Sequence, residues 1–170
     1  MIVEPLLTAT FFAFCLAVIY GALSDAATYT IPNWVSYGLA VLFAVFVALA
    51  WQRTPVLWHL GLGLTVFFIC MVFWKLRWLG GGDVKFVGAI SLWMGPANIL
   101  PFLILLSVLS AILVMALLYA RRWNPYLQGK SLPEFVKRMI RKAEERAIPY
   151  GLPAAIAALI VAPRLIAAAY

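Results

Sequence analysis

Charged residues are scarce in this sequence, and their scarcity excludes a water-soluble fold. Only 11% of the 170 residues are charged, whereas 66% are hydrophobic, and the mean hydropathy is +1.01. A soluble domain of this size is about half apolar and about a quarter charged. Because a soluble fold could not bury so much apolar surface, the sequence predicts an integral membrane protein.

Cysteine and histidine are also rare, with two cysteines and one histidine in the chain. Cys15 and Cys70 lie far apart in apolar stretches and form no C-x-x-C pair, so neither a zinc module nor a disulfide framework is indicated. We interpret both as small buried hydrophobic residues. The glycine-rich stretch 80–83 lacks the Lys-Ser/Thr ending of a nucleotide-binding loop. No metal or cofactor is therefore expected.

Basic residues exceed acidic ones, but most of them lie in one segment, residues 121–146. Their arrangement favours a cytoplasmic loop beside anionic lipid headgroups. A nucleic-acid partner is not expected, because the basic residues share this loop with three glutamates and do not alternate with aromatic residues. The N-terminal residues lack the basic region of a signal peptide, so the first apolar segment is expected to be a retained span.

The apolar residues fall into six segments, which predict an all-α, polytopic membrane protein with six transmembrane helices in a single domain, residues 1–170. A spanning helix needs about 20 apolar residues, so the fourth segment, halted by Gly95-Pro96, is expected to form a short helix. The predicted segments are residues 5–23, 32–51, 56–74, 83–94, 99–120 and 152–169.

Alternation of the six segments predicts their orientation. Lys75, Arg77, Lys85 and the polar loop 121–149 fall on one side, and the other side holds Arg53 and Arg164. The positive-inside rule places the richer side in the cytoplasm and both termini outside.

The chain contains only two aspartates, Asp25 and Asp83, and both interrupt hydrophobic sequence. An ionisable residue in or beside a spanning helix is a functional candidate, because its solvation there is costly. Each also has a structural interpretation: Asp83 could cap the helix that it opens, and Asp25 could lie in a solvated turn. Both fall at the predicted cytoplasmic ends of their helices, where two carboxylates could share a proton and activate water for hydrolysis.

Three glycines, residues 80–82, precede Asp83. Glycine allows the backbone to unwind and to approach other groups closely. We therefore expect irregular backbone beside a wet cavity here, with room for an extended substrate strand.

These motifs resemble those of the type IV prepilin peptidases. Gly80-Gly81-Gly82-Asp83-Val84-Lys85 matches the family signature G-x-G-D-x-K, and Asp25 followed by Ile31-Pro32-Asn33 resembles the first family aspartate and its I-P-N element. Pro149-Tyr150-Gly151 resembles a further element, so that the resemblance extends over essentially the whole chain. G-x-G-D alone also occurs in presenilin-like proteases, and the joint occurrence makes the match specific.

The resemblance implies an aspartic endopeptidase of the bacterial inner membrane that removes the basic leader of prepilins or pseudopilins. Asp25 and Asp83 would be catalytic, and the residues implied to shape the site are Gly80, Gly82, Lys85, Asn33 and Pro32. Lys85 could instead anchor the helix at the interface, contact an acidic substrate residue or tune Asp83 electrostatically, and Asn33 could cap or cross-link helices. We do not expect His59 to be catalytic, because it starts an outward-side helix far from the aspartates.

The longer members of that family carry an insertion with paired C-x-x-C ligands, with which N-methylation is associated. The insertion is absent here, so the chain resembles the short form that processes Flp-type (tight-adherence) pilins, and N-methylation lacks support. One departure from the family pattern is that residues 26–30 contain no basic residue.

Two other function classes are compatible with intramembrane aspartates: a small proton- or cation-coupled transporter or channel subunit, and a structural assembly partner. A transporter would be expected to show two related halves with broken helices in matching positions. No such symmetry is present, because Asp25 follows a full-length segment whereas Asp83 opens a truncated one. The sequence carries no signal for an oligomeric state.

Overall fold

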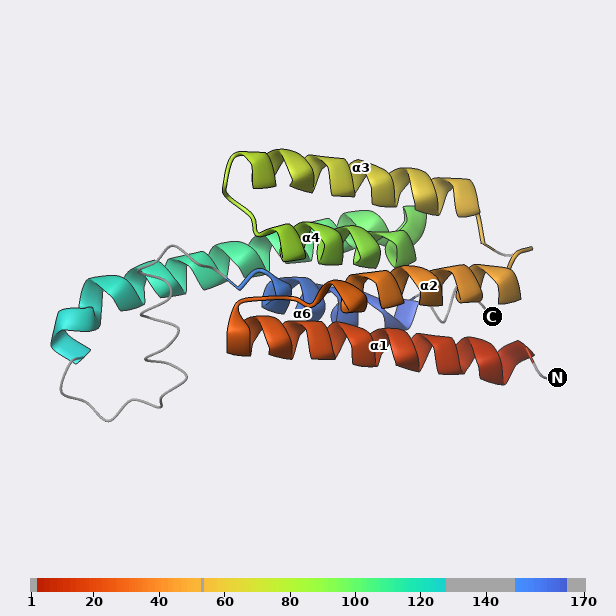
Figure 1. Cartoon of the computed structure of the whole chain (residues 1–170), viewed down its shortest axis with the longest axis horizontal. Coiled ribbons are helices and arrows are strands. Elements are labelled where there is room, and N and C mark those ends of the chain that lie inside the picture. Colours follow the sequence, from red (N-terminus) through yellow and green to blue (C-terminus); the bar gives the residue numbers. More distant parts are fainter. Residues whose placement is uncertain (1–2, 53, 128–148, 165–170) are drawn as a thin grey trace.

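The computed structural model describes residues 3–52, 54–127 and 149–164, and this part of the chain folds entirely into helices and short connections (Figure 1). The described residues form five helices: α1 (Val3–Thr28), α2 (Asn33–Leu49), α3 (Val56–Lys75), α4 (Gly81–Leu127) and α6 (Gly151–Val161). Residues 128–148 of the predicted polar loop and residues 165–169 of the sixth predicted segment lie outside the described residues.

Three of these helices are long and apolar enough to cross a membrane: α1, α3 and the part of α4 from Gly81 to Tyr119. The helices α2 and α6 are apolar but shorter within the described residues. The all-helical membrane fold is therefore confirmed, but six separate spanning helices are not shown.

The fourth and fifth predicted segments both lie in α4, which breaks at Gly95. Gly95 has φ 57° and ψ −174°, a conformation that L side chains rarely adopt, and Pro96 follows it without a backbone N–H. At this break the chain turns back, so the first half of α4 (residues 81–94) and the second half (residues 96–127) run in opposite directions (Figure 1). The predicted break at Gly95-Pro96 is confirmed.

The end of α1 corrects the sequence prediction, which ended this helix at Leu23. The helix continues through Asp25 to Thr28, and Tyr29 ends it with a positive φ of 57°. Short hydroxyl side chains satisfy the backbone here: Thr28 donates to the Ser24 carbonyl at 2.8 Å, and Ser24 donates to the Thr30 carbonyl at 2.9 Å. Because polar residues support the last turn, hydropathy alone marks the helix end too early.

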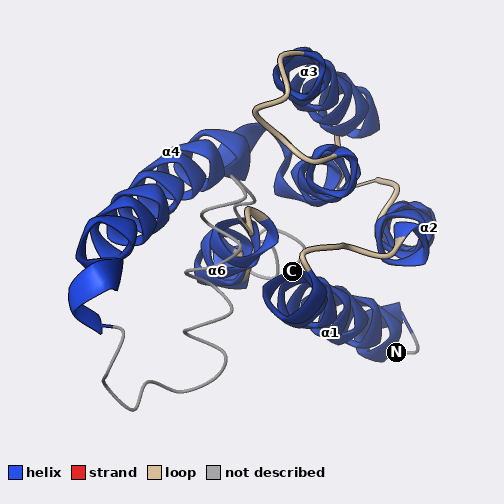
Figure 2. Ribbon diagram, turned by 60° about the vertical axis from the view of Figure 1, so that its left-hand side comes forward, coloured by secondary structure: helices blue, strands red, loops and turns tan. Residues whose placement is uncertain are grey.

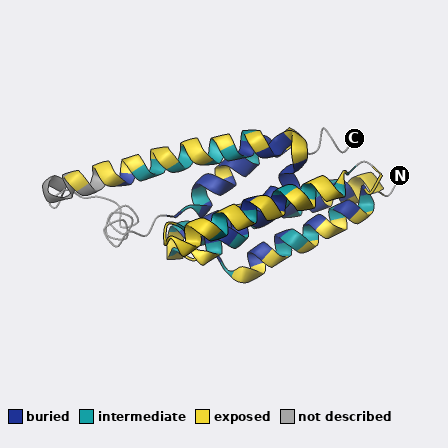
Figure 3. Ribbon diagram, turned by 90° about the horizontal axis from the view of Figure 1, so that it is seen from above, coloured by how far each residue is buried: buried dark blue, intermediate teal, exposed yellow. Residues whose placement is uncertain are grey.

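Small residues let α6 pack in the centre of the bundle, between α1 and the second half of α4 (Figure 2). Four alanines of α6 are almost completely buried, as their small size predicted: Ala154, Ala155, Ala157 and Ala158. Exposed residues run along the outer faces of the surrounding helices (Figure 3). They include large apolar side chains such as Phe12, Leu16 and Ile112. An outer surface of this composition suits contact with lipid.

Overpacking the centre of the bundle tests this arrangement. We expect Ala158→Leu to lower the free energy of unfolding by about 1–3 kcal/mol, because a fully buried alanine leaves no space for the added carbons. The measurement is thermal or denaturant unfolding of the protein in detergent. Ala44→Leu, the same change at an exposed position of α2, should leave the stability nearly unchanged. Equal stability of the two variants would contradict the central position of α6.

Candidate active site

Asp25 lies in the last turn of α1, and its carboxylate is directed at the start of α6. The side chain is only 3% exposed. The backbone N–H of Gly151, the first residue of α6, donates a hydrogen bond to Asp25 Oδ2 at 2.7 Å. A helix N-terminus carries partial positive charge and free N–H groups, so it stabilises a carboxylate at this position. The structural interpretation of Asp25 as a residue in a solvated turn is therefore wrong.

Asp83 lies in the first turn of α4 and is 7% exposed. Its Oδ2 accepts a hydrogen bond from the backbone N–H of Gly80 at 3.1 Å. The Gly80 carbonyl accepts from the Val84 N–H, so Gly80 is the cap residue and Asp83 the third helical residue, the arrangement of one half of a capping box. The capping role considered for Asp83 is therefore real, although the helix begins two residues before it, at Gly81.

The expected irregular backbone at the glycines before Asp83 is not found. Gly81 and Gly82 are helical, and none of the three glycines has a positive φ, so the backbone is not unwound here. Close approach, the other expected use of glycine, is present: a Cβ added at Gly82 would lie 3.3–3.4 Å from the backbone and Cβ of Ile31. A Cβ added at Gly80 would lie 2.8 Å from Asp83 Oδ2.

Ile31 connects the surroundings of the two aspartates. Its backbone packs against Gly82, beside Asp83, and its Cδ1 lies where a Cβ on Gly151, beside Asp25, would be only 2.9 Å away. Residues from α1, α4 and α6 therefore converge around one buried isoleucine. The two carboxylates thus lie on either side of Ile31, one beside Gly151 and the other beside Gly82.

The I-P-N element positions a second polar contact next to the aspartates. Pro32, with φ −60° and ψ 135°, caps α2, so that Asn33 is its first residue. Lys85 Nζ donates to Asn33 Oδ1 at 2.9 Å and lies 6.0 Å from the centre of the Tyr37 ring. This contact links the first half of α4 to α2, in agreement with the cross-linking role considered for Asn33.

Tyr150 is a neighbour of the site that the sequence assigned no role, although the motif Pro149-Tyr150-Gly151 had marked its position. It precedes α6, and its ring is partly buried. Burial raises the pKa of the Tyr150 hydroxyl, and the negative charge of Asp83 raises it further. Tyr150 therefore keeps its proton at neutral pH beside the aspartates. Gly151 was missed in the same way, because its contact with Asp25 joins residues far apart in the sequence.

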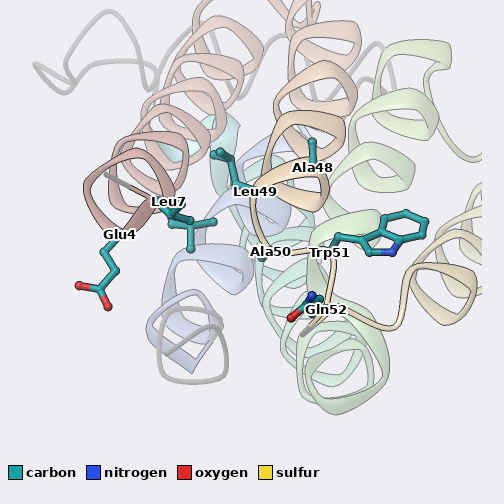
Figure 4. Close-up of a pocket in the computed structure, with 8 residues that line it drawn as sticks. Glu4, Leu7, Ala48, Leu49, Ala50, Trp51 and Gln52 are labelled. Carbon is teal, nitrogen blue, oxygen red and sulfur yellow. The ribbon is translucent and has the colours of Figure 1, made fainter. Parts of the chain in front are cut away.

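The residues of the site belong to no metal cluster: in the described part of the chain, no three His, Cys, Asp or Glu side chains gather closely enough to hold an ion. An open pocket of about 490 Å³ lies elsewhere, between the start of α1 and the end of α2 (Figure 4). Its residues Glu4 and Leu7 precede Asp25 by several turns of α1, which places the pocket about 30 Å along the helix from the aspartates. The pocket is therefore separate from the site.

Comparison with known proteins identifies the family. The model of the type IV leader peptidase family matches residues 12–115, which include Asp25, the I-P-N element and Asp83. No curated protein and no solved structure matches the chain. The family consists of aspartic-type prepilin peptidases, and the match covers more than half of the chain. The chain therefore belongs to the type IV leader peptidase family.

Proposed function

We propose that the protein removes the basic N-terminal leader of type IV prepilins or pseudopilins, with Asp25 and Asp83 as the catalytic pair. Family membership supports leader cleavage as the reaction. The observation that carries the assignment of the pair is the convergence of two buried aspartates, from α1 and α4, around Ile31 and the start of α6. The choice of Flp-type pilins as the substrate rests on the resemblance to the short form of the family.

The two carboxylates divide the work of hydrolysis. One carboxylate is ionised and takes a proton from a water molecule, which attacks the scissile carbonyl. The other is protonated, donates a hydrogen bond to the carbonyl oxygen and later gives a proton to the leaving amine. Two like charges in one buried site favour the singly protonated pair, which supplies both roles at once.

The backbone N–H groups of Gly151 and Gly80 keep the carboxylates oriented during this exchange. Each donates to one oxygen, Oδ2, of one aspartate. In each case the other oxygen, Oδ1, has no hydrogen-bond partner among those found in the described residues, which leaves it available for water or substrate.

Charge asymmetry supports a cytoplasmic position for the pair. Lys75, Arg77 and Lys85 lie at the same end of the bundle as the start of α4, and the positive-inside rule assigns such an end to the cytoplasm. The protein is accordingly proposed to lie in the bacterial inner membrane with its site toward the cytoplasm. A prepilin leader is basic and remains on that side, so cleavage would fall where the leader meets the membrane-spanning part of the substrate.

Substitution of either aspartate tests the catalytic pair. We expect Asp25→Asn and Asp83→Asn each to lower leader removal by at least about 100-fold, because either change removes a group that must exchange protons. The measurement is the size of a co-expressed prepilin, compared at equal amounts of membrane-inserted protein. Glu4→Gln, which changes an exposed acid at the far end of α1, should process normally. Near-normal processing by either aspartate variant would refute the pair.

Gly151 offers a test of the geometry that leaves both aspartates in place. A Cβ at this position would lie 2.8 Å from Asp25 Oδ2, 2.9 Å from Asp25 Cβ and 2.9 Å from Ile31 Cδ1. Gly151→Ala should therefore displace the Asp25 carboxylate and reduce kcat by about tenfold or more.

The matched controls are Gly38→Ala and Gly61→Ala, because a Cβ at either glycine meets no atom within 4 Å. Both should retain wild-type turnover, and alanine should be tolerated better than glycine in these helices. Full activity of Gly151→Ala would show that the contact between Asp25 and α6 is not needed for catalysis.

A further inference from the structure

The break in α4 contains a backbone carbonyl that its own helix cannot satisfy. In an α-helix the carbonyl of Leu92 would accept a hydrogen bond from the N–H four residues later, which here belongs to Pro96 and does not exist. The positive φ of Gly95 also turns the following backbone away. An unsatisfied carbonyl costs several kcal/mol inside a membrane, because no water replaces the missing partner.

His59 of α3 satisfies this carbonyl. Its Nδ1 lies 2.7 Å from the Leu92 oxygen, and because a carbonyl can only accept, the ring carries its hydrogen on Nδ1. The ring also stacks on Phe43 of α2, with 5.5 Å between the ring centres. A Cβ on Gly95 would overlap three atoms of the ring, so the imidazole fills the space that the glycine leaves.

Trp93 adds a second contact at the same end of the helix. Its Nε1 donates to the Leu39 carbonyl of α2 at 2.9 Å, and the ring packs against Phe14 of α1. The far end of the first half of α4 is thus fixed to α1, α2 and α3. Asp83 lies at the opposite end of the same half, which is about 20 Å long.

A helix of this length moves nearly as a rigid body, so its position at one end affects the other. Near Asp83 the helix is held by the close approach of Gly82 to Ile31, by the fully buried ring of Phe86 at Gly21 of α1, and by the Lys85–Asn33 hydrogen bond, which is exposed. Exposed contacts of this kind contribute little by themselves. The helix is therefore fixed mainly by buried contacts, at Gly82 and Phe86 near Asp83 and around Gly95 at its far end.

We propose that His59 is a positioning residue: by bonding the Leu92 carbonyl, it fixes the half-helix that carries Asp83 in the orientation that brings this carboxylate to Asp25. This role goes beyond the proposed function and, as far as catalysis is concerned, rests on it. His59 does not touch the reacting atoms and acts only through the position of residues 81–94.

Disulfide formation between residue 31 and residue 82 of α4 tests the position of the half-helix 81–94, and it requires no measurement of peptidase activity. A Cβ at Gly82 would lie 3.4 Å from Ile31 Cβ, close to the separation of about 3.5–4.5 Å found in disulfides. The Ile31→Cys/Gly82→Cys double variant, with Cys15→Ala and Cys70→Ala to remove the native thiols, should therefore cross-link on mild oxidation in membranes. The yield is expressed per molecule of accumulated protein, so that lower accumulation does not affect it.

Two replacements of His59 separate hydrogen bonding from filling of space. Asparagine and leucine have similar shapes, but only asparagine can donate a hydrogen bond to the Leu92 carbonyl. We expect His59→Leu to lose most of the cross-link and His59→Asn to retain it. Leu57→Ala, a change at an exposed position of the same helical turn, should cross-link like the parent. Equal cross-linking of the leucine and asparagine variants would overturn the proposal.

Kinetics on the protein with native residues at 31 and 82 provide the second readout. We expect His59→Leu to reduce kcat by about 10- to 100-fold through misplacement of Asp83, with KM unchanged because the substrate contacts remain. His59→Asn should restore most of the turnover. A rise in KM at unchanged kcat would overturn the positioning role. If the wild-type protein cleaved no prepilin, the proposed function would fail, while the cross-linking would still decide the role of His59.

Discussion

Carboxylates inside a membrane protein need hydrogen-bond donors, because the surrounding hydrocarbon offers no water to solvate them. The fold supplies these donors from the backbone at the starts of two helices. The Gly151 N–H of α6 meets Asp25, and the Gly80 N–H at the start of α4 meets Asp83. The positive ends of both helix dipoles thus point at the same site. This constraint explains why α1, α4 and α6 must bring their ends together, with the two acidic groups on either side of Ile31.

Glycines, which have no side chain, allow the ends of these helices to come together. The backbones of α4 and the α1–α2 connection approach one another at Gly82 and Ile31, and α6 approaches Asp25 at Gly151. The alanines of α6 allow similarly close packing along the rest of that helix. A membrane bundle lacks the hydrophobic driving force of a soluble core, so helices associate through close van der Waals packing of this kind. Gly80 and Gly82 of the signature therefore act through close approach to neighbouring atoms, not through an unwound backbone.

The break at Gly95 gives α4 a second role in the architecture. It divides the helix into two halves. The short half carries Asp83 and lies beside α3, and the longer half returns along α6 (Figures 1 and 2). The carbonyl that the break leaves without a helical partner is satisfied by His59, the single histidine of the chain. A residue at the opposite end of the bundle is in this way connected with the position of a carboxylate, through one continuous helix.

Much of this structure could be predicted from local sequence. Hydropathy determined the membrane class and the approximate helices, Gly95-Pro96 determined the break, and the spacing of Asp25, Ile31-Pro32-Asn33 and Gly80–Asp83 determined the family. Hydropathy placed the end of α1 too early, because hydroxyl side chains extend the helix past its apolar part. Only the tertiary structure decided the contacts of Asp25 with Gly151, of Lys85 with Asn33 and of His59 with Leu92. These contacts join residues between 33 and 126 positions apart. Local propensity and periodicity describe how a segment folds by itself, whereas such pairs exist only after the helices have packed.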